Sequence, residues 1–419
     1  MLVKRVRMMT VAVCVGVSLW LTGCWDGVDL QQRALVLMIG VDPADSVGPF
    51  GSTSPVDKNG ALIPGAATSP SEAVKVTVQL ARPHRLGIPP SGGQSSGSKK
   101  DSPVITVSEE GRDIGEALRR IQLSLNRTLF FGHLQAVVIN RKLAEAGILT
   151  VLNPLVQSRV VSRNLWMFVS ESPTEQFLKQ TPTLDVIPAM YLTNLFRNHV
   201  WINRPYDATI GGFHQRLVTP GIDPYTFVIT GMDPKLTAPH IDGLAVFSGD
   251  RLVGYMTSSR FTGWSMIENQ FPKSKLAFSC PEDSGKQFVV DVKSVHSRMR
   301  VRDLRRQRPY VEVEVRLRGS VEGGPCVLME TDAELRKLRQ AIQQQTASMI
   351  ASAIRWTQSP LQSDLLGIGR EVYRHSPRDW HGDEWWNQMF QRLDVRVHVD
   401  PRIDFIQTYH QSGLMYRQG

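Results

Sequence analysis

The residues with the most definite chemistry lie near the start of the chain, at Leu21, Thr22, Gly23 and Cys24. A cysteine sulfur is a nucleophile that can accept a diacylglyceryl group, and the small residues before it let a peptidase reach the preceding bond. The apolar run before them, of about 14 residues, is too short to cross a bilayer. The pattern predicts a signal peptide over residues 1–23 and a lipid on Cys24. Two acyl chains are expected, because a single chain binds a membrane only marginally.

Several motifs of known catalytic mechanism are absent from the sequence, which has no HExxH, no P-loop and no CxxC. Residues 367–369 (Gly-Ile-Gly) begin a dinucleotide-binding pattern but lack its third glycine and its preceding strand. His381, Asp383 and Glu384 lie close together, but near neighbours on a helix face different directions, so no metal site is expected there. We therefore predict no catalytic residue, no metal and no cofactor apart from the covalent diacylglyceryl lipid.

An arginine-rich segment joins two expected strands and contains Arg298, Arg300, Arg302, Arg305, Arg306 and Arg308. The planar donor fork of a guanidinium group suits phosphate and carboxylate oxygens. The segment is therefore either a solvated loop or a contact site for phospholipid headgroups or an acidic partner. A second cluster is aromatic, and its helical spacing favours core packing while leaving a partner-facing role open. Its members are Trp380, Trp385, Trp386 and Phe390.

The four cysteines of the sequence have different expected fates. Cys14 leaves with the signal peptide and Cys24 carries the lipid. Cys280 and Cys326 remain, in a compartment that permits disulfides. They flank expected strands of one domain, so a disulfide between them and a pair of free thiols both stay open, because sequence does not fix their separation.

Composition indicates a folded protein with one membrane attachment. The apolar fraction of 42% and the charged fraction of 21% are those of globular chains, and after residue 21 no apolar run is long enough to span a bilayer. Loss of residues 1–23 would leave 396 of the 419 residues and lower the formal charge from +9 to +6. A modest positive charge beside a membrane favours anionic headgroups, and nucleic acid is excluded as a partner outside the cytoplasm.

Periodicity predicts the elements that must position these groups. Residues 34–41 form an apolar run of strand length and residues 74–80 alternate with period two, so we expect them to pair. Residues 241–256 are typical of a hairpin, with Gly249 in its turn. Other expected elements are two long strands that should pair, at 287–295 and 310–317, a helix at 332–358 and a last strand at 395–399.

The predicted fold class is α+β, or mixed α/β, with three successive domains after the cleaved signal peptide. Each domain is expected to hold a mixed or antiparallel sheet packed with helices. The boundary near Arg204 rests on a stretch of weak periodicity with scattered proline, asparagine and glycine. The expected domains are 24–204, with flexible Gly/Pro/Ser-rich loops at 43–72 and 83–103, then 205–277 with the hairpin, and 278–419 with the long helix.

Several short motifs occur together, in one order along nearly the whole mature chain. They are Cys24-Trp25-Asp26, Ile39-Gly40-Val41-Asp42, Phe131-Gly132-His133, Asp242-Gly243-Leu244-Ala245-Val246-Phe247 with Gly254, and Gly367-Ile368-Gly369 followed by spaced tryptophans. On these motifs the sequence resembles the GerAC/Ger(x)C family of spore germination lipoproteins. The two low-complexity loops are longer than such proteins are expected to have.

The resemblance implies the C subunit of a nutrient germinant receptor in an endospore former. Such a subunit would be held by its lipid on the outer face of the spore inner membrane, beside integral-membrane A and B subunits. The resemblance also implies three α/β-type domains and no enzymatic activity. It implies no direct binding of a small-molecule ligand, and only Cys24 is carried over as a functional residue, the lipid attachment site.

Two other classes of function remain open from the sequence. A solute-binding lipoprotein of an ABC importer shares the lipidation motif, but such proteins usually form two lobes around a ligand cleft. The long alternating strands at 287–295 and 310–317 favour antiparallel pairing instead. A lipid-anchored envelope hydrolase would need a nucleophile or a metal site assembled from distant residues.

Overall fold

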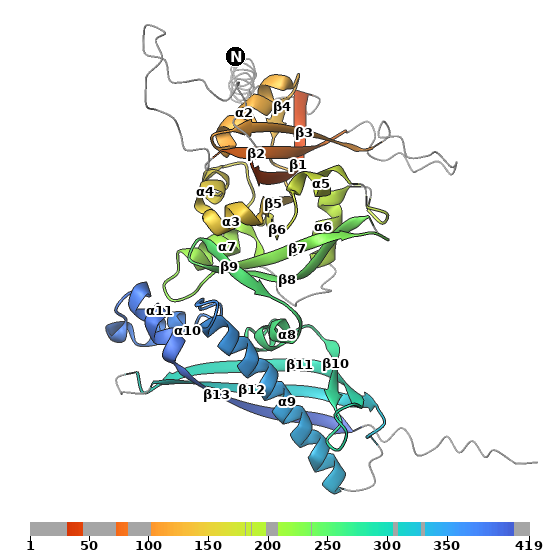
Figure 1. The fold of residues 1–419 in the computed structure, drawn as a ribbon, viewed down its shortest axis with the longest axis vertical. Coiled ribbons are helices and arrows are strands. Elements are labelled where there is room, and N and C mark those ends of the chain that lie inside the picture. Colours follow the sequence, from red (N-terminus) through yellow and green to blue (C-terminus); the bar gives the residue numbers. More distant parts are fainter. Residues whose placement is uncertain are drawn as a thin grey trace, which may run out of the picture.

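The computed structural model describes residues 32–44, 73–82, 102–180, 182–185, 187–197, 208–235, 237–304, 309–327 and 332–405. These residues form an elongated molecule with two sheets, the larger in the upper part of Figure 1 and the smaller in the lower part. Helices pack on both sheets, so the mixed α/β class expected from the sequence is confirmed. Residues 1–23, predicted to be a signal peptide, Cys24 and most of the two expected loops lie outside the described residues.

The first sheet contains nine strands: β1 (Arg33–Pro43), β2 (Val74–Ala81), β3 (Val104–Gly111), β4 (Thr128–Phe130), β5 (Ala136–Asn140), β6 (Trp166–Ser170), β7 (Tyr225–Asp233), β8 (Ala238–Ser248) and β9 (Arg251–Met256). Their order is β3-β2-β1-β5-β6-β7-β8-β9, and β4 pairs with the start of β1. The central strands β1, β5, β6 and β7 run parallel, whereas the strands on either side of them are antiparallel.

Helices cover both faces of this first sheet. One face carries α2 (Ile114–Ser124), α3 (Arg141–Ala146), α4 (Leu149–Gln157) and α7 (Ile210–Leu217), and the other carries α5 (Thr174–Lys179) and α6 (Pro188–Arg197). Strand residues alternate between the two layers, as Val137 and Val138 of β5 do. Helix α2 begins where the Asp113 carboxylate accepts a hydrogen bond from the Glu116 backbone N–H at 2.8 Å, an N-cap.

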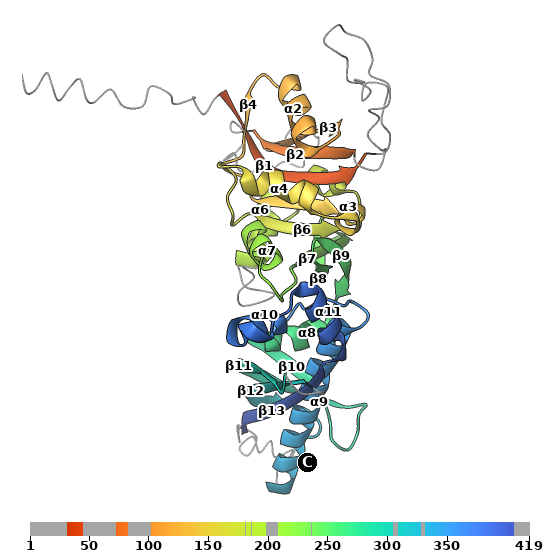
Figure 2. The same ribbon diagram turned by 90° about the vertical axis from the view of Figure 1, so that its left-hand side faces the viewer.

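The second sheet has the order β10-β11-β12-β13. Its strands are β10 (Ser274–Ser279), β11 (Gln287–Arg302), β12 (Tyr310–Gly323) and β13 (Asp394–Phe405), of which only β12 and β13 pair in parallel. Its helices are α8 (Ser258–Ile267), α9 (Asp332–Gln358), α10 (Ile368–His375) and α11 (Asp383–Arg392), with the short 3-10 helix η5 (Pro377–Asp379). Figure 2 shows α9 running along the sheet toward the far end of the molecule.

The helices of the lower part pack closely, and one glycine makes this packing geometrically feasible. A Cβ on Gly263 of α8 would lie 2.4 Å from the carbonyl oxygen of Met349 in α9. The missing side chain therefore lets the two helix backbones touch. One apolar cluster continues from Leu244 of β8 through Trp264 of α8 to Ile354 of α9, so the core crosses between the two sheets.

The observed division of the chain differs from the expected one. The expected boundary near Arg204 falls between β6 and β7, which are hydrogen-bonded neighbours of one sheet. Within the described part, residues 205–277 have no sheet of their own, because β7, β8 and β9 complete the first sheet and β10 starts the second. In the weakly periodic stretch 182–220, Pro188 is the first residue of α6, and Gly211 and Gly212 lie in the first turn of α7.

Candidate functional site

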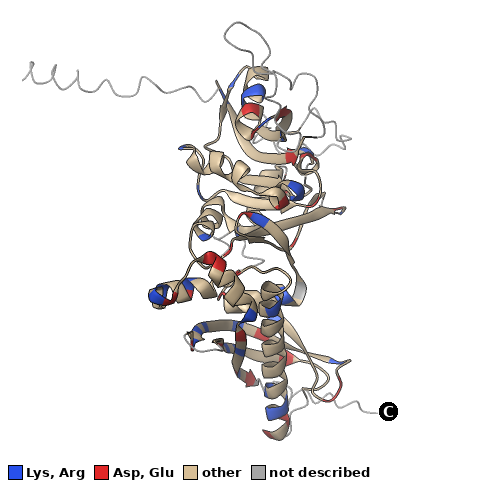
Figure 3. Ribbon diagram, turned by 60° about the vertical axis from the view of Figure 1, so that its left-hand side comes forward, with Lys and Arg blue, Asp and Glu red and all other residues tan. Residues whose placement is uncertain are grey.

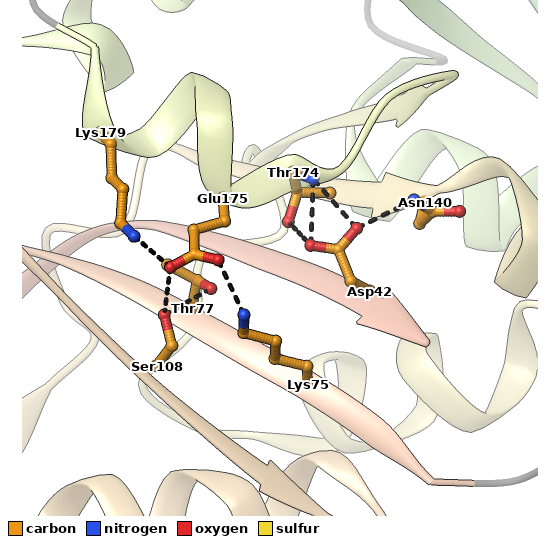
Figure 4. Close-up of polar contacts among 8 residues, drawn as sticks. All are labelled: Asp42, Lys75, Thr77, Ser108, Asn140, Thr174, Glu175 and Lys179. Atoms are coloured by element: carbon orange, nitrogen blue, oxygen red, sulfur yellow. Dashed lines mark hydrogen bonds and ion pairs between the residues drawn. The ribbon is translucent and has the colours of Figure 1, made fainter. Parts of the chain in front are cut away.

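Three clusters of polar groups stand out, and the first lies where β1 meets α5 (Figure 4). The Asp42 carboxylate, only 6% exposed, accepts hydrogen bonds from the backbone N–H and the hydroxyl of Thr174 and from the amide of Asn140, at 2.7–3.0 Å. Thr174 begins α5, so the carboxylate binds free N–H groups at a helix N-terminus. Asp42 thereby fixes α5 on the sheet.

Gly40 completes this contact between strand and helix. A Cβ at this position would lie 2.2 Å from the Thr174 hydroxyl oxygen, far inside van der Waals contact. Gly40 and Asp42 lie two residues apart and therefore on the same face of β1. The Ile-Gly-Val-Asp motif thus has a structural reason, since one residue makes room for α5 and the other binds its first turn.

Glu175 extends the cluster to the neighbouring strands. Its carboxylate lies 2.7 Å from the Lys75 ammonium of β2 and also binds Lys179 and the Ser108 hydroxyl. The hydrogen bond from Lys179, with that from Lys75, lowers the pKa of Glu175 to about 2. Figure 4 shows these side chains pointing at one another across β2, β3 and α5. The cluster offers ion pairs and caps, which hold elements together.

The second cluster joins the two parts of the molecule at the loops before β7 and α10. Gly221 has φ +71°, and a Cβ on it would lie 2.3 Å from the Gly369 carbonyl carbon. The Arg370 backbone N–H donates to the Gly221 carbonyl oxygen at 2.8 Å. A Cβ on Gly369 would lie 2.4 Å from the Trp386 indole nitrogen. The Gly-Ile-Gly motif therefore lies at a close backbone contact between the domains, with Gly367 as the N-cap of α10 and Gly369 in its first turn.

Asp364 organises this junction. Its carboxylate is 1% exposed and accepts hydrogen bonds from the Gly369 N–H at 2.7 Å and the Trp386 indole N–H at 2.8 Å. Burial raises the pKa of Asp364 to about 6, against the effect of its hydrogen-bond donors. The backbone N–H of Asp364 in turn donates to the Asp223 carboxylate at 2.7 Å, and burial raises the pKa of Asp223 as well.

Arg216 of α7 crosses the same junction and is 4% exposed. Its guanidinium donates to the carbonyl oxygen of Asp223 at 3.0 Å and to that of Leu365 on the other side of the junction. The guanidinium also lies 4.9 Å from the centre of the Tyr225 ring. A buried cation with carbonyl acceptors in both domains ties their backbones together.

The third cluster is a basic groove at the end of β11, beside α10. It has a volume of about 590 Å³, and five arginines but only two glutamates line it. The arginines are Arg298, Arg300, Arg302, Arg370 and Arg374. Three of the six arginines singled out in the sequence therefore lie at one groove, and two further arginines reach it from α10. Arg305, Arg306 and Arg308 lie outside the described residues. Figure 3 shows Lys and Arg gathered at this end of the lower sheet and on the helix beside it.

The other predicted residues are placed as follows. Cys280 and Cys326 form a disulfide, which ties the end of β10 to the segment after β12. Trp386 and Phe390 are buried, whereas Trp380 and Trp385 are partly buried against the core. His381 packs edge-on against the ring of Trp385 at 5.1 Å. Among the described residues no group of three or more His, Cys, Asp or Glu could hold a metal ion.

Sequence reasoning missed the buried polar residues Asp42, Arg216, Asp223 and Asp364 as structural centres. Asp42 had a detectable signal, because a carboxylate that ends an apolar strand is available to cap a helix. Arg216 had none, since its acceptor Leu365 lies far along the chain. Asp364 binds the nearby N–H of Gly369, but its contact with Asp223 spans 141 residues and no local pattern records it. The groove residues Arg370 and Arg374 were missed because α10 is short and its neighbour β11 is distant in sequence.

The fold and these clusters define a class of protein: a multidomain α/β protein whose conspicuous polar groups join helices, strands and domains. Two family profiles match the chain in succession. "Spore germination protein N-terminal domain" covers residues 26–231, and "Spore germination B3/GerAC like, C-terminal" covers residues 242–406. The chain belongs to the GerAC family of spore germination proteins, as its motifs indicated.

Relatives from Bacillus subtilis (strain 168) match along almost their whole length. The putative spore germination protein YfkR is 23% identical over 96% of both chains. Spore germination protein KC is 25% identical over 91% of this chain and 92% of its own. A solved structure, the crystal structure of the GerBC protein, matches with 13% identity and a TM-score of 0.49, over 79% of this chain and 93% of that chain.

Proposed function

We propose that this chain is the lipid-anchored C subunit of a nutrient germinant receptor, acting without catalysis beside integral-membrane A and B subunits in spore germination. The observation that carries the proposal is the pair of family domains over residues 26–406 with a lipidation motif directly before them. The first domain begins two residues after Cys24. A diacylglyceryl group on Cys24 would attach the folded part to the outer face of the spore inner membrane.

Two structural findings bear on this proposal. None of the helices in the described ranges is long and apolar enough to cross a membrane. The buried polar groups described above fix the two domains as a scaffold, and each of the three clusters consists of ion pairs, caps or arginines. The covalent lipid would be the single added group, with neither metal nor small-molecule cofactor.

The test is purification of an epitope-tagged chain from the inner membrane of spores, followed by identification of co-purifying proteins. We expect two integral-membrane subunits of a germinant receptor, and we expect Cys24→Ala to leave the chain in the soluble fraction. Recovery of an importer permease instead would support the solute-binding alternative. Membrane fractionation of Cys24→Ala equal to that of the wild type would contradict the lipid assignment.

A further inference from the structure

The strand β11 has a free edge where it borders the basic groove. Strand β10 pairs with β11 only as far as Ser274 opposite Val292. Strand β12 continues beside β11 to Tyr310 opposite Arg302. Within the described part of the chain, the second half of β11 therefore has a neighbouring strand on one side only. A free edge presents backbone N–H and C=O groups that can pair with another strand.

Asn269 shows which backbone groups face outward. Its side-chain amide accepts a hydrogen bond from the Ser297 N–H at 2.7 Å and donates one to the Ser297 carbonyl at 3.2 Å. Alternate residues of a strand direct their N–H and C=O groups to the same side. The corresponding groups of Met299 and Val301 therefore face outward too, into the groove. The Asn269 side chain thus makes the two hydrogen bonds to Ser297 that the backbone of a neighbouring strand would make.

Side chains of two kinds flank this edge. Burial alternates along β11, so Arg298, Arg300 and Arg302 lie on the exposed face, while Met299 and Val301 lie on the half-buried face. Both sets line the groove. A strand added here would alternate in the same way, with its side chains on one face near guanidinium groups and those on the other near apolar groups.

The charges of the groove favour an acidic occupant. Arg300 and Arg302 lie 3.2 and 3.3 Å from the carboxylates of Glu314 and Glu312 on β12. Arg298 and Arg370 line the groove without a side-chain partner among the described residues. A carboxylate could pair with each of these two guanidinium groups in bidentate geometry.

We propose that the free edge of β11 binds an extended segment of a partner polypeptide in which acidic and apolar residues alternate, adding it to the sheet as a fifth strand. This mode combines backbone hydrogen bonds with side-chain selection. The inference rests on the function proposed above, because it gives the contact surface and the chemistry of a receptor partner.

A polypeptide suits the groove better than a membrane surface does. Lipid headgroups would meet the arginines but leave the outward backbone groups of β11 unpaired. The exposed face of the sheet also carries Glu312 and Glu314 in ion pairs with the arginines, which weakens its attraction for a uniformly anionic surface. Figures 1 and 2 place the start of β1 at the upper end of the molecule and the groove in the lower domain. The tether from Cys24 to residue 32 reaches at most about 28 Å, so a lipid there would hold the upper end nearest the membrane.

The experiment titrates the full chain, in neutral detergent, with a fluorescein-labelled eight-residue peptide of alternating glutamate and valine. We expect saturable binding that Arg298→Gln combined with Arg370→Gln weakens at least tenfold. The matched control is Arg402→Gln, an exposed arginine of β13 outside the groove, and it should leave the affinity within twofold. Val301→Pro removes one outward N–H without touching the β12 ladder and should weaken binding similarly.

Two altered peptides separate the backbone from the charge. Methylation of alternate backbone nitrogens on the edge-facing side should weaken binding at least tenfold, and lysine in place of glutamate should abolish it. Equal binding of either peptide, or no binding of the glutamate peptide, would overturn the proposal. The proposal would also be overturned if phosphatidylglycerol vesicles displaced the glutamate peptide and this displacement required Arg298, since the groove would then bind the membrane. If receptor subunits co-purify but the peptide fails to bind, only this inference fails, whereas loss of co-purification refutes the proposed function whatever the peptide does.

Discussion

The substitution Gly369→Ala tests whether the close contact at the junction stabilises the two-domain arrangement. The added Cβ would lie 2.4 Å from the indole nitrogen of Trp386, which is 1% exposed. Either the ring or α10 must move, and movement of the ring breaks its hydrogen bond to Asp364. Overpacking costs about 1–3 kcal/mol and loss of a hydrogen bond to a charged acceptor about 1.5–3 kcal/mol. Alanine returns about 1 kcal/mol of helix propensity, so we expect a net loss of about 1.5–5 kcal/mol.

The assay is urea unfolding followed by tryptophan fluorescence, with the free energy of unfolding taken from the midpoint and slope. The matched control is Gly231→Ala in β7, where a Cβ would meet no atom within 4 Å. That control should stabilise the chain by about 0.4–1 kcal/mol through the unfolded state, so the two substitutions should change stability in opposite directions. The reasoning is refuted if Gly369→Ala leaves the midpoint unchanged or moves it in the same direction as the control.

Three further predictions concern other contacts. Replacing Cys280 and Cys326 by serine should lower the free energy of unfolding by about 4 kcal/mol, because the bond closes a loop of 46 residues; an unchanged urea midpoint would contradict this. Burial raises the pKa of Asp364 to about 6, so its protonated carboxyl favours the folded state in full below about pH 4. About 3 kcal/mol of this stability should be lost as the pH rises from 4 through 6. Asp364→Asn should remove that fall, and parallel pH curves for variant and wild type would disprove it. Asp42→Ala should leave the Thr174 N–H without its carboxylate acceptor, so amide exchange should quicken in α5 but not in α6, and equal protection of α5 in both proteins would refute the capping role.

The sequence was informative about single elements and their local pairing. The strands expected at 287–295 and 310–317 are β11 and β12, and they pair antiparallel as predicted. The helix expected at 332–358 has those bounds in α9, because its apolar stripe keeps one phase from Leu338 to Ile354. The strands expected at 34–41 and 74–80 pair as β1 and β2. Each of these predictions depends on periodicity within one segment.

Arrangement over long distances was not predictable in the same way. The weak stretch before Pro220 contains α6 and α7, whose short lengths give periodicity little room, so a boundary was expected inside a continuous sheet. The groove joins β11 to α10, and the junction joins Gly221 to Gly369, across distances that no local pattern records. For the same reason the sequence indicated neither the arginines that reach the groove from α10 nor the contact of Gly369 with Gly221.

The parallel pairing of β12 with β13 has a consequence for the synthesis of the chain. Strand β13 is the last described strand, and the helices α9, α10 and α11 all precede it in the sequence. Until the ribosome has made β13, the hairpin of β11 and β12 has no neighbour along β12, and loop closure over such a separation is slow. A premature stop codon between the end of β12 and Asp394 would therefore leave the β12 border of the hairpin unpaired, and the truncated chain would be prone to aggregation.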